Sequence, residues 1–166
     1  MPLNDDGTFA GMNCNGMQCS GKALFDFCDQ IARKAWRTRD ENALDWVWYL
    51  WCGRRSPFSG RVVKTFERSY IEDKATWKEP IDAYFELAKR PETCDAILRE
   101  FHLHPSGAHI INGHTPVKTG KGEVPVRAEG KLLVIDGGFC RAYQPQTGIA
   151  GYTLIANSRG LRLKAH

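Results

Sequence analysis

The residues that could do chemistry begin with a histidine at the end of a short apolar run. His114 lies in HIINGHTPVK, residues 109–118, directly after Asn112 and Gly113. The apolar run predicts a buried strand, and the Asn-Gly pair predicts a sharp turn at its end, because glycine adopts backbone angles that other residues resist. Neutral imidazole is the commonest metal ligand, and ligands of open α/β sheets gather beyond strand ends. A lone histidine after a turn is also a common structural feature, so both interpretations stay open.

A second run, LLVIDGGFCRAY at residues 132–143, leads from an expected buried strand into Asp136 and two glycines. Asp136 stands where a carboxylate could accept a hydrogen bond from a metal-binding histidine and so fix its tautomer. The alternative is a plain Asp-Gly turn. His102 and His104 could also bind a metal, but they follow an expected helix. Since histidine suits the helix dipole there, we favour the structural role.

Several cations are scattered between the expected strands, and such side chains bind phosphate groups. The alternative for each is a solvated loop position. These residues are Lys118, Lys121, Arg127 and Arg141.

The elements before these motifs are predicted to be helical. Ser20 can cap a helix that runs to about Arg37, and a second helix follows from Asp40 to Gly53. Two more are expected near Pro80 and Pro91, because proline is well placed at a first helical position. Apolar residues at helical spacing predict the buried faces. For the first helix they are Ala23, Leu24, Phe27, Cys28, Ile31, Ala35 and Trp36, for the second Leu44, Val47, Trp48 and Trp51, and for the last Cys94, Ile97, Leu98 and Phe101.

From Pro105 onward the pattern changes to short β-runs and glycine turns. Strands are expected at residues 108–112 and 131–135, and a hairpin at residues 151–156 and 161–164 around NSRG. Residues 54–61, RRSPFSGR, are predicted to form a loop. Helices followed by mixed and antiparallel strands predict an α+β fold.

Bulk composition is that of an ordinary water-soluble domain. The 166 residues are 42% hydrophobic and 25% charged, with a net charge of +4 spread along the chain. No run reaches the roughly 18 apolar residues of a membrane helix, no dense basic tract indicates nucleic acid, and the N-terminus lacks a secretory pattern.

None of the six cysteines forms a Cys-x-x-Cys pair, so we expect reduced core residues in a cytoplasmic protein. Trp46, Trp48 and Trp51 are expected in the core.

Together the motifs resemble the C-terminal part of class 3 fructose-1,6-bisphosphatase, a bacterial member of the calcineurin-like metallophosphoesterases. The resemblance is carried by IINGHTPVK, KLLVIDGGFCRAYQPQTGIAGYTLI and NSRGLRLKAH. Earlier segments that resemble the family are PLNDDGTF, SGKALFDF, WYLWCGRRSPFSG and TFERSYIEDKATWKEP. A Gly-His-Thr-Pro alone would indicate only the superfamily, whereas the further segments indicate this subfamily.

The resemblance implies hydrolysis of the 1-phosphate of fructose 1,6-bisphosphate in gluconeogenesis, with a pair of divalent ions, usually Mn²⁺. It assigns the metal-binding histidine to His114 and makes Asp136 and Tyr143 the catalytic candidates. Lys118, Arg141 and Tyr143 are the substrate-binding candidates. It also implies that residues 1–166 are the C-terminal portion of one calcineurin-like α/β/β/α sandwich domain. Residues 20–104 would be a mainly helical insert, and residues 105–166 would supply core strands.

The chain departs from the superfamily pattern in its metal ligands. Neither Asp-x-His nor Gly-Asn-His occurs anywhere in the 166 residues. Two divalent ions need about four to six ligands each, so one histidine cannot hold them. We therefore expect a fragment that is inactive alone and binds Mn²⁺ weakly. Its expected partners are fructose 1,6-bisphosphate and the N-terminal portion of the same enzyme, or further copies of itself.

Two other functions stay open on the sequence. One is another calcineurin-like phosphoesterase, such as a protein phosphatase, although the helical material at residues 20–103 argues against it. The other is a non-catalytic fragment or pseudoenzyme that acts only through association.

Overall fold

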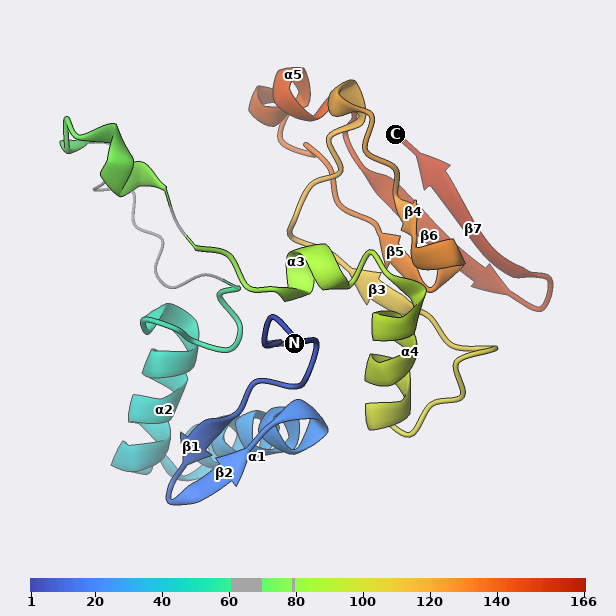
Figure 1. Ribbon diagram of the computed structural model, residues 1–166. Coiled ribbons are helices and arrows are strands. Elements are labelled where there is room, and N and C mark those ends of the chain that lie inside the picture. The colour runs from blue at the N-terminus through green and yellow to red at the C-terminus, as the bar shows by residue number, and fades with distance from the viewer. Residues whose placement is uncertain (61–69, 79) are drawn as a thin grey trace. The chain divides into compact units, whose positions relative to one another are not determined.

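A computed structural model describes residues 1–60, 70–78 and 80–166 (Figure 1). The chain divides into two compact units, Met1–Leu87 and Ala88–His166. Predictions that fall on residues 61–69 and 79 lie outside the described residues. They concern Arg61 of the expected loop and part of the segment TFERSYIEDKATWKEP. In the described part of the chain, no helix is long and apolar enough to cross a membrane.

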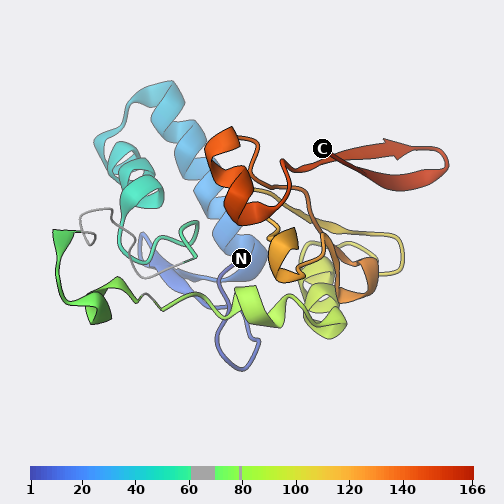
Figure 2. The same ribbon diagram turned by 90° about the horizontal axis from the view of Figure 1, so that it is seen from above.

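The first unit is built on a hairpin and two helices that lie side by side (Figure 1, Figure 2). Strands β1 (Met12–Cys14) and β2 (Met17–Cys19) pair antiparallel, a hairpin that the sequence analysis did not predict. Helix α1 (Gly21–Thr38) and helix α2 (Glu41–Cys52) confirm the first two expected helices. Asp40 caps α2 by accepting a hydrogen bond from the Ala43 N–H at 3.0 Å.

The core of this unit confirms the expected face of α1 in part. Leu24, Cys28, Ile31 and Ala35 are buried together with the hairpin cysteines, Cys14 and Cys19. Ala23 is exposed and Trp36 is 77% exposed, so the predicted face was too wide. The Trp36 ring lies beneath the Arg39 guanidinium instead, 5.4 Å from the ring centroid.

Helix α2 buries the opposite face from the one predicted. Its core contacts come from Ala43 and Leu50, with Trp46 and Tyr49 packed beside them. Leu44, Val47, Trp48 and Trp51 are all exposed, so the prediction that they are core was wrong. The reason is that apolar side chains occur all round α2, and spacing alone did not indicate which stripe faces α1.

The rest of the first unit is irregular. Residues 54–60 form turns, as expected of the loop. A 3₁₀ turn, η2, spans Lys74–Trp77, and the helix expected near Pro80 is only the short α3 (Tyr84–Leu87). An Asp82 carboxylate oxygen accepts hydrogen bonds from the Leu3 and Tyr84 N–H groups, which ties α3 to the N-terminus.

The second unit contains helix α4 (Pro91–Glu100), which confirms the helix expected at Pro91, and a three-stranded mixed sheet. The strands are β3 (Ile110–Asn112), β4 (Val126–Arg127) and β5 (Leu132–Val134). β5 lies in the middle, parallel to β3 and antiparallel to β4. All three residues of β5 are buried, whereas Ile111 of β3 is 51% exposed. The expected burial of the first strand was therefore wrong, because β3 is an edge strand.

The expected hairpin is confirmed as β6 (Tyr152–Asn157) and β7 (Gly160–Ala165), seen at the right of Figure 1. Three short turns complete the unit, which are η3 (Thr119–Lys121), η4 (Ala128–Gly130) and η5 (Arg141–Tyr143). The short helix α5 (Gln144–Thr147) follows η5 directly. The helices and small mixed sheets confirm the α+β class.

The cysteines confirm the core interpretation at four positions and correct it at two. Cys14, Cys19, Cys28 and Cys94 are buried, whereas Cys52 and Cys140 are exposed. Burial raises the pKa of the Cys14 thiol to about 12, and the Cys19 thiol beside it acts in the same direction. Burial also raises the pKa values of Cys28 and Cys94. These thiols are therefore neutral packing groups at ordinary pH.

Candidate functional site

The candidate site lies beyond the carboxyl ends of the two parallel strands. Asn112 of β3 is paired with Val134 of β5, so His114 and Asp136 each follow their strand end by two residues. Two backbone hydrogen bonds continue the pairing. Ile135 N–H donates to the Asn112 carbonyl at 2.9 Å, and Val117 N–H donates to the Asp136 carbonyl at 3.1 Å. The backbone of the Gly-His-Thr-Pro turn is thereby held beside Asp136.

His114 is exposed and has a left-handed backbone, with φ of 64°. A non-glycine residue in this region costs on the order of 1 kcal/mol, although histidine tolerates it better than most. The turn is closed by the Thr115 N–H, which donates to the Gly113 carbonyl at 2.7 Å. Within the described residues, the His114 imidazole makes no hydrogen bond. The imidazole nitrogens are therefore accessible to a metal ion, and the hydrogen-bonded turn fixes the position of the residue.

Asp136 is half-buried, and its carboxylate accepts a hydrogen bond from the Gly137 N–H at 2.7 Å. No hydrogen bond joins this carboxylate to His114 in the described part of the chain. Gly137 is packed closely, since a Cβ there would lie 2.6 Å from the Gly151 Cα. Gly138 N–H donates to the Ile149 carbonyl at 2.9 Å. These glycines let the backbone pack against the start of the β6–β7 hairpin.

The candidate phosphate-binding residues come from two turns that Thr147 connects. Lys118 precedes η3, and Arg141 and Tyr143 form η5; all three side chains are exposed. The Thr119 hydroxyl donates to the Thr147 carbonyl at 3.0 Å. The buried Thr147 hydroxyl lies 2.7 Å from the Ile149 carbonyl and 3.3 Å from the Tyr143 carbonyl.

Sequence reasoning missed Thr147 as the positioning residue of these turns. A threonine directly before Gly148 at the end of a short helix was the available signal, because a hydroxyl there can reach nearby carbonyls. Gly148 has φ of 77°, as expected of a glycine that ends a helix. Two hydrogen bonds therefore link these turns through Thr147: its backbone carbonyl binds the Thr119 hydroxyl of η3, and its own hydroxyl binds the Tyr143 carbonyl of η5.

The metal-binding capacity of this site is small. Among the described residues, no group of three or more His, Cys, Asp or Glu side chains could hold a metal ion. Beyond the strand ends, the described chain offers one free imidazole and one carboxylate that is already hydrogen-bonded. These donors alone do not fit a pair of divalent ions.

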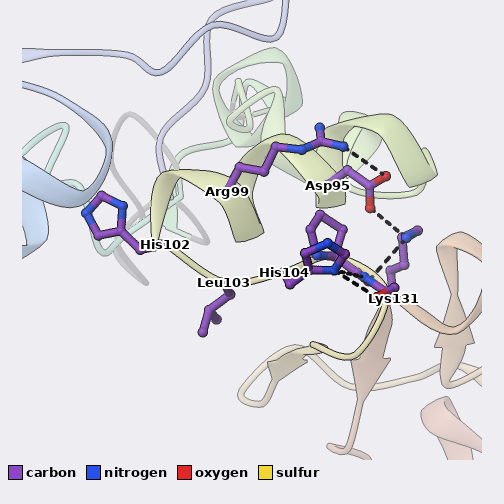
Figure 3. A pocket seen from close by; sticks show the side chains of 8 residues that line it. Asp95, Arg99, His102, Leu103, His104 and Lys131 are labelled. Atoms are coloured by element: carbon purple, nitrogen blue, oxygen red, sulfur yellow. Dashed lines mark hydrogen bonds and ion pairs between the residues drawn. The ribbon is translucent and has the colours of Figure 1, made fainter.

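A separate pocket of about 540 Å³ lies between α4 and the start of β5 (Figure 3). Its polar groups are largely paired with each other. Lys131 Nζ lies 2.6 Å from an Asp95 carboxylate oxygen and 3.5 Å from the Pro105 carbonyl. His104 Nδ1 lies 2.7 Å from the Ser106 hydroxyl, and the His102 ring points away from this cluster (Figure 3). We interpret the pocket as a structural junction between α4 and the sheet.

The sheet and the polar turns beyond its parallel strands define an α+β protein with a candidate site at those strand ends. The chain belongs to the family described as Firmicute fructose-1,6-bisphosphatase, whose sequence model matches residues 1–166. No solved structure matches the chain.

Similar curated proteins are named fructose-1,6-bisphosphatase class 3. One from Clostridium tetani is 52% identical over 172 residues, and proteins from Clostridium novyi and Bacteroides fragilis are each 51% identical. Each match covers the whole of this chain but only 26% of the relative. The chain thus spans about a quarter of the length of the curated relatives it matches.

Proposed function

We propose that this chain is part of a class 3 fructose-1,6-bisphosphatase that converts fructose 1,6-bisphosphate and water into fructose 6-phosphate and phosphate. The water oxygen bonds to phosphorus while the bond between phosphorus and the C1 oxygen breaks. The observation that carries the proposal is the match of the family along all 166 residues. The names of the relatives favour this reaction over that of other calcineurin-like phosphoesterases.

The residues of this chain take defined roles in the proposal. His114 binds one of two divalent ions, which we propose are Mn²⁺. Lys118 and Arg141 bind the phosphate groups of the substrate, and Tyr143 faces the sugar phosphate. Asp136 holds the backbone at the strand ends through its carbonyl and its hydrogen bond to Gly137. The exposure of His114 and of the cationic turns supports these roles.

The remaining metal ligands come from polypeptide outside this chain in our proposal. The partner is the N-terminal portion of the same enzyme, in a calcineurin-like sandwich to which residues 105–166 contribute strands. Association of several copies is the alternative source of the missing groups. The proposed setting is gluconeogenesis in the cytoplasm. The shortage of donors among the described residues supports the need for a partner.

The test is phosphate release from fructose 1,6-bisphosphate with Mn²⁺ present. The 166-residue chain is assayed alone and mixed with the Clostridium tetani relative from which the matching quarter has been removed. We expect release only from the mixture. Release by the chain alone would contradict the need for a partner, and no release from a mixture that forms a complex would contradict the proposed activity.

A non-catalytic, associating fragment is the second candidate function. It is favoured by the same shortage of metal donors among the described residues. Under this function the mixture would form a complex, but neither removal of the metal nor substitution of His114 would change the stability of that complex.

A further inference from the structure

The clearest unexplained feature outside the candidate site is the exposed side of α2. Four residues at positions i, i+3, i+4 and i+7 form a stripe on this helix, which we name the tryptophan face. They are Leu44, Val47, Trp48 and Trp51, with exposed fractions of 39%, 37%, 64% and 79%. Residues at this spacing lie along one side of a helix. Apolar side chains of this size are seldom left together in water.

The other side of α2 is already used. Ala43 and Leu50 are buried against the first unit, and Trp46 and Tyr49 pack at the same place. The helix carries acidic residues only at Glu41 and Asp45, and residues 46–52 contain no charged side chain. The last two turns of α2, residues 46–52, are thus apolar on all sides, and such a helical surface belongs in the interior of a larger protein or in a membrane.

A membrane does not suit α2. Its 12 residues correspond to a length of about 18 Å, whereas the apolar layer of a bilayer is about 30 Å thick. A pair of identical chains held together by this face alone does not suit it either. A helix of this length and about 10 Å width presents roughly 180 Å² in projection, well below the roughly 800 Å² per partner of a standard interface.

We infer that the tryptophan face is the surface on which the remainder of the class 3 fructose-1,6-bisphosphatase polypeptide packs. This inference rests on the proposed function, which requires that remainder as a partner. Roughly three quarters of each relative lies outside the part matched by this chain. A partner of that size contacts the tryptophan face as one part of a larger interface, so the small area of the face is no obstacle.

The tryptophan face is organised before it meets a partner. The rings of Trp48 and Trp51 meet edge to face with centroids 5.7 Å apart. The Cys52 thiol donates to the Trp48 carbonyl at 3.3 Å, and Asp40 fixes the start of the helix. Rigid aromatic side chains lose little conformational freedom on binding, which is why tryptophan is enriched at the centre of interfaces.

The test measures binding of the 166-residue chain to the Clostridium tetani relative that lacks the matching quarter. The wild-type chain is compared with a Trp48→Ser/Trp51→Ser double variant. We expect the double variant to bind at least about 30-fold more weakly, since buried interface tryptophans commonly carry that much affinity. A Trp48→Phe/Trp51→Phe variant should retain most of the binding, because it keeps the apolar rings. Circular dichroism checks that α2 is intact in every variant.

Trp36→Ser is the matched control, because Trp36 is also an exposed tryptophan of the first unit, 77% accessible, and lies outside the tryptophan face. Equal loss in this variant would overturn the assignment to α2. So would unchanged binding by the double variant, no binding by any form, or a wild-type chain that dimerises through Trp48 and Trp51. A His114→Ala variant separates this inference from the proposed activity, since it should bind the partner normally while phosphate release falls about 1000-fold.

Discussion

Helix α2 and the turns beyond β3 and β5 both place side chains in solvent, but side chains of opposite character. On α2 they are large and apolar, and on the turns they are an imidazole, cations and a phenol. The first region has more apolar surface than its own unit covers, and the second has fewer metal donors than its proposed chemistry needs. The partner that we propose would account for both shortages. The comparison shows that exposure means different things for tryptophan and for histidine.

The largest effect that would sharpen this comparison is expected at His114. Substitution by alanine should lower phosphate release by the mixture about 1000-fold, because a lost metal ligand removes stabilisation of the transition state. His102→Ala is the matched control, since His102 is also exposed and has φ of 59°. Steady-state assays of phosphate release with Mn²⁺ compare the two variants. Equal activities of the two variants would break the assignment.

The next largest effect is the difference in unfolding free energy between a substitution in the buried core of the first unit and one on its exposed tryptophan face. Leu24 is 2% exposed, and Leu24→Ala should lower the free energy of unfolding by about 3 kcal/mol through the cavity it leaves. Trp51→Ser should change it by less than about 0.5 kcal/mol in the isolated chain, because the ring contacts mainly water and Trp48. Urea titrations of both variants measure the difference. A large loss for Trp51→Ser would mean that α2 is already covered.

A smaller effect is expected at Thr147. Thr147→Val keeps the shape but leaves the Ile149 and Tyr143 carbonyls without their hydroxyl partner, at a cost of about 1–2 kcal/mol. Because the Thr147 hydroxyl positions η5, which carries Arg141 and Tyr143, KM for the bisphosphate should rise in the mixture. Thr153→Val, at an exposed position of β6, serves as the control. An unchanged KM would show that η5 is positioned without the Thr147 hydroxyl.

Alkaline pH should weaken the first unit by a comparable amount. The Cys14 pKa is about 12 when folded, against an ordinary value of 9.0, so the folded state favours the neutral thiol. This contribution to stability is complete below pH 9 and is lost as the pH rises toward 12. At pH 10 the loss is about 1 kcal/mol. Urea titrations at pH 8 and pH 10 test it, and Cys14→Ala should remove the Cys14 part of the dependence.

The smallest effect is expected from the exposed cations. Lys118→Ala should raise KM for the bisphosphate about threefold, since solvent weakens the attraction between an exposed ammonium group and phosphate. Lys164→Ala, on β7, is the control for a general loss of positive charge. Both are measured in the mixture at two salt concentrations. A change of KM in the control equal to that in Lys118→Ala would refute a specific contact.

The helices, the hairpin at the end of the chain and the strand ends near His114 could be predicted from the sequence. Periodicity, caps and turn residues are local, and α1, α4, β5 and β6–β7 depend mostly on them. The buried side of α2 was not predictable in this way, because apolar residues surround the helix and only the contact with α1 selects among them. The β1–β2 hairpin was missed because its strands have three residues each and little alternation.

The candidate site was predictable as a set of residue types but not as an arrangement. His114 and Asp136 were found because strand-end turns are readable in sequence. Thr147 was missed because its role depends on carbonyls of Tyr143 and Ile149 that meet only after folding. The structure adds the hydrogen bonds that connect these turns, and only the tertiary fold brings their donors and acceptors together.

The close packing at Gly137 limits how this protein can be altered. Even alanine there would bring a methyl carbon to 2.6 Å from the Gly151 Cα and 2.7 Å from the Ala150 carbonyl oxygen, and both neighbours are backbone atoms. Directed evolution of the proposed activity toward another sugar phosphate would naturally randomise residues near Asp136. Libraries should hold Gly137 fixed and vary Lys118, Arg141 and Tyr143, whose exposed side chains leave room for change.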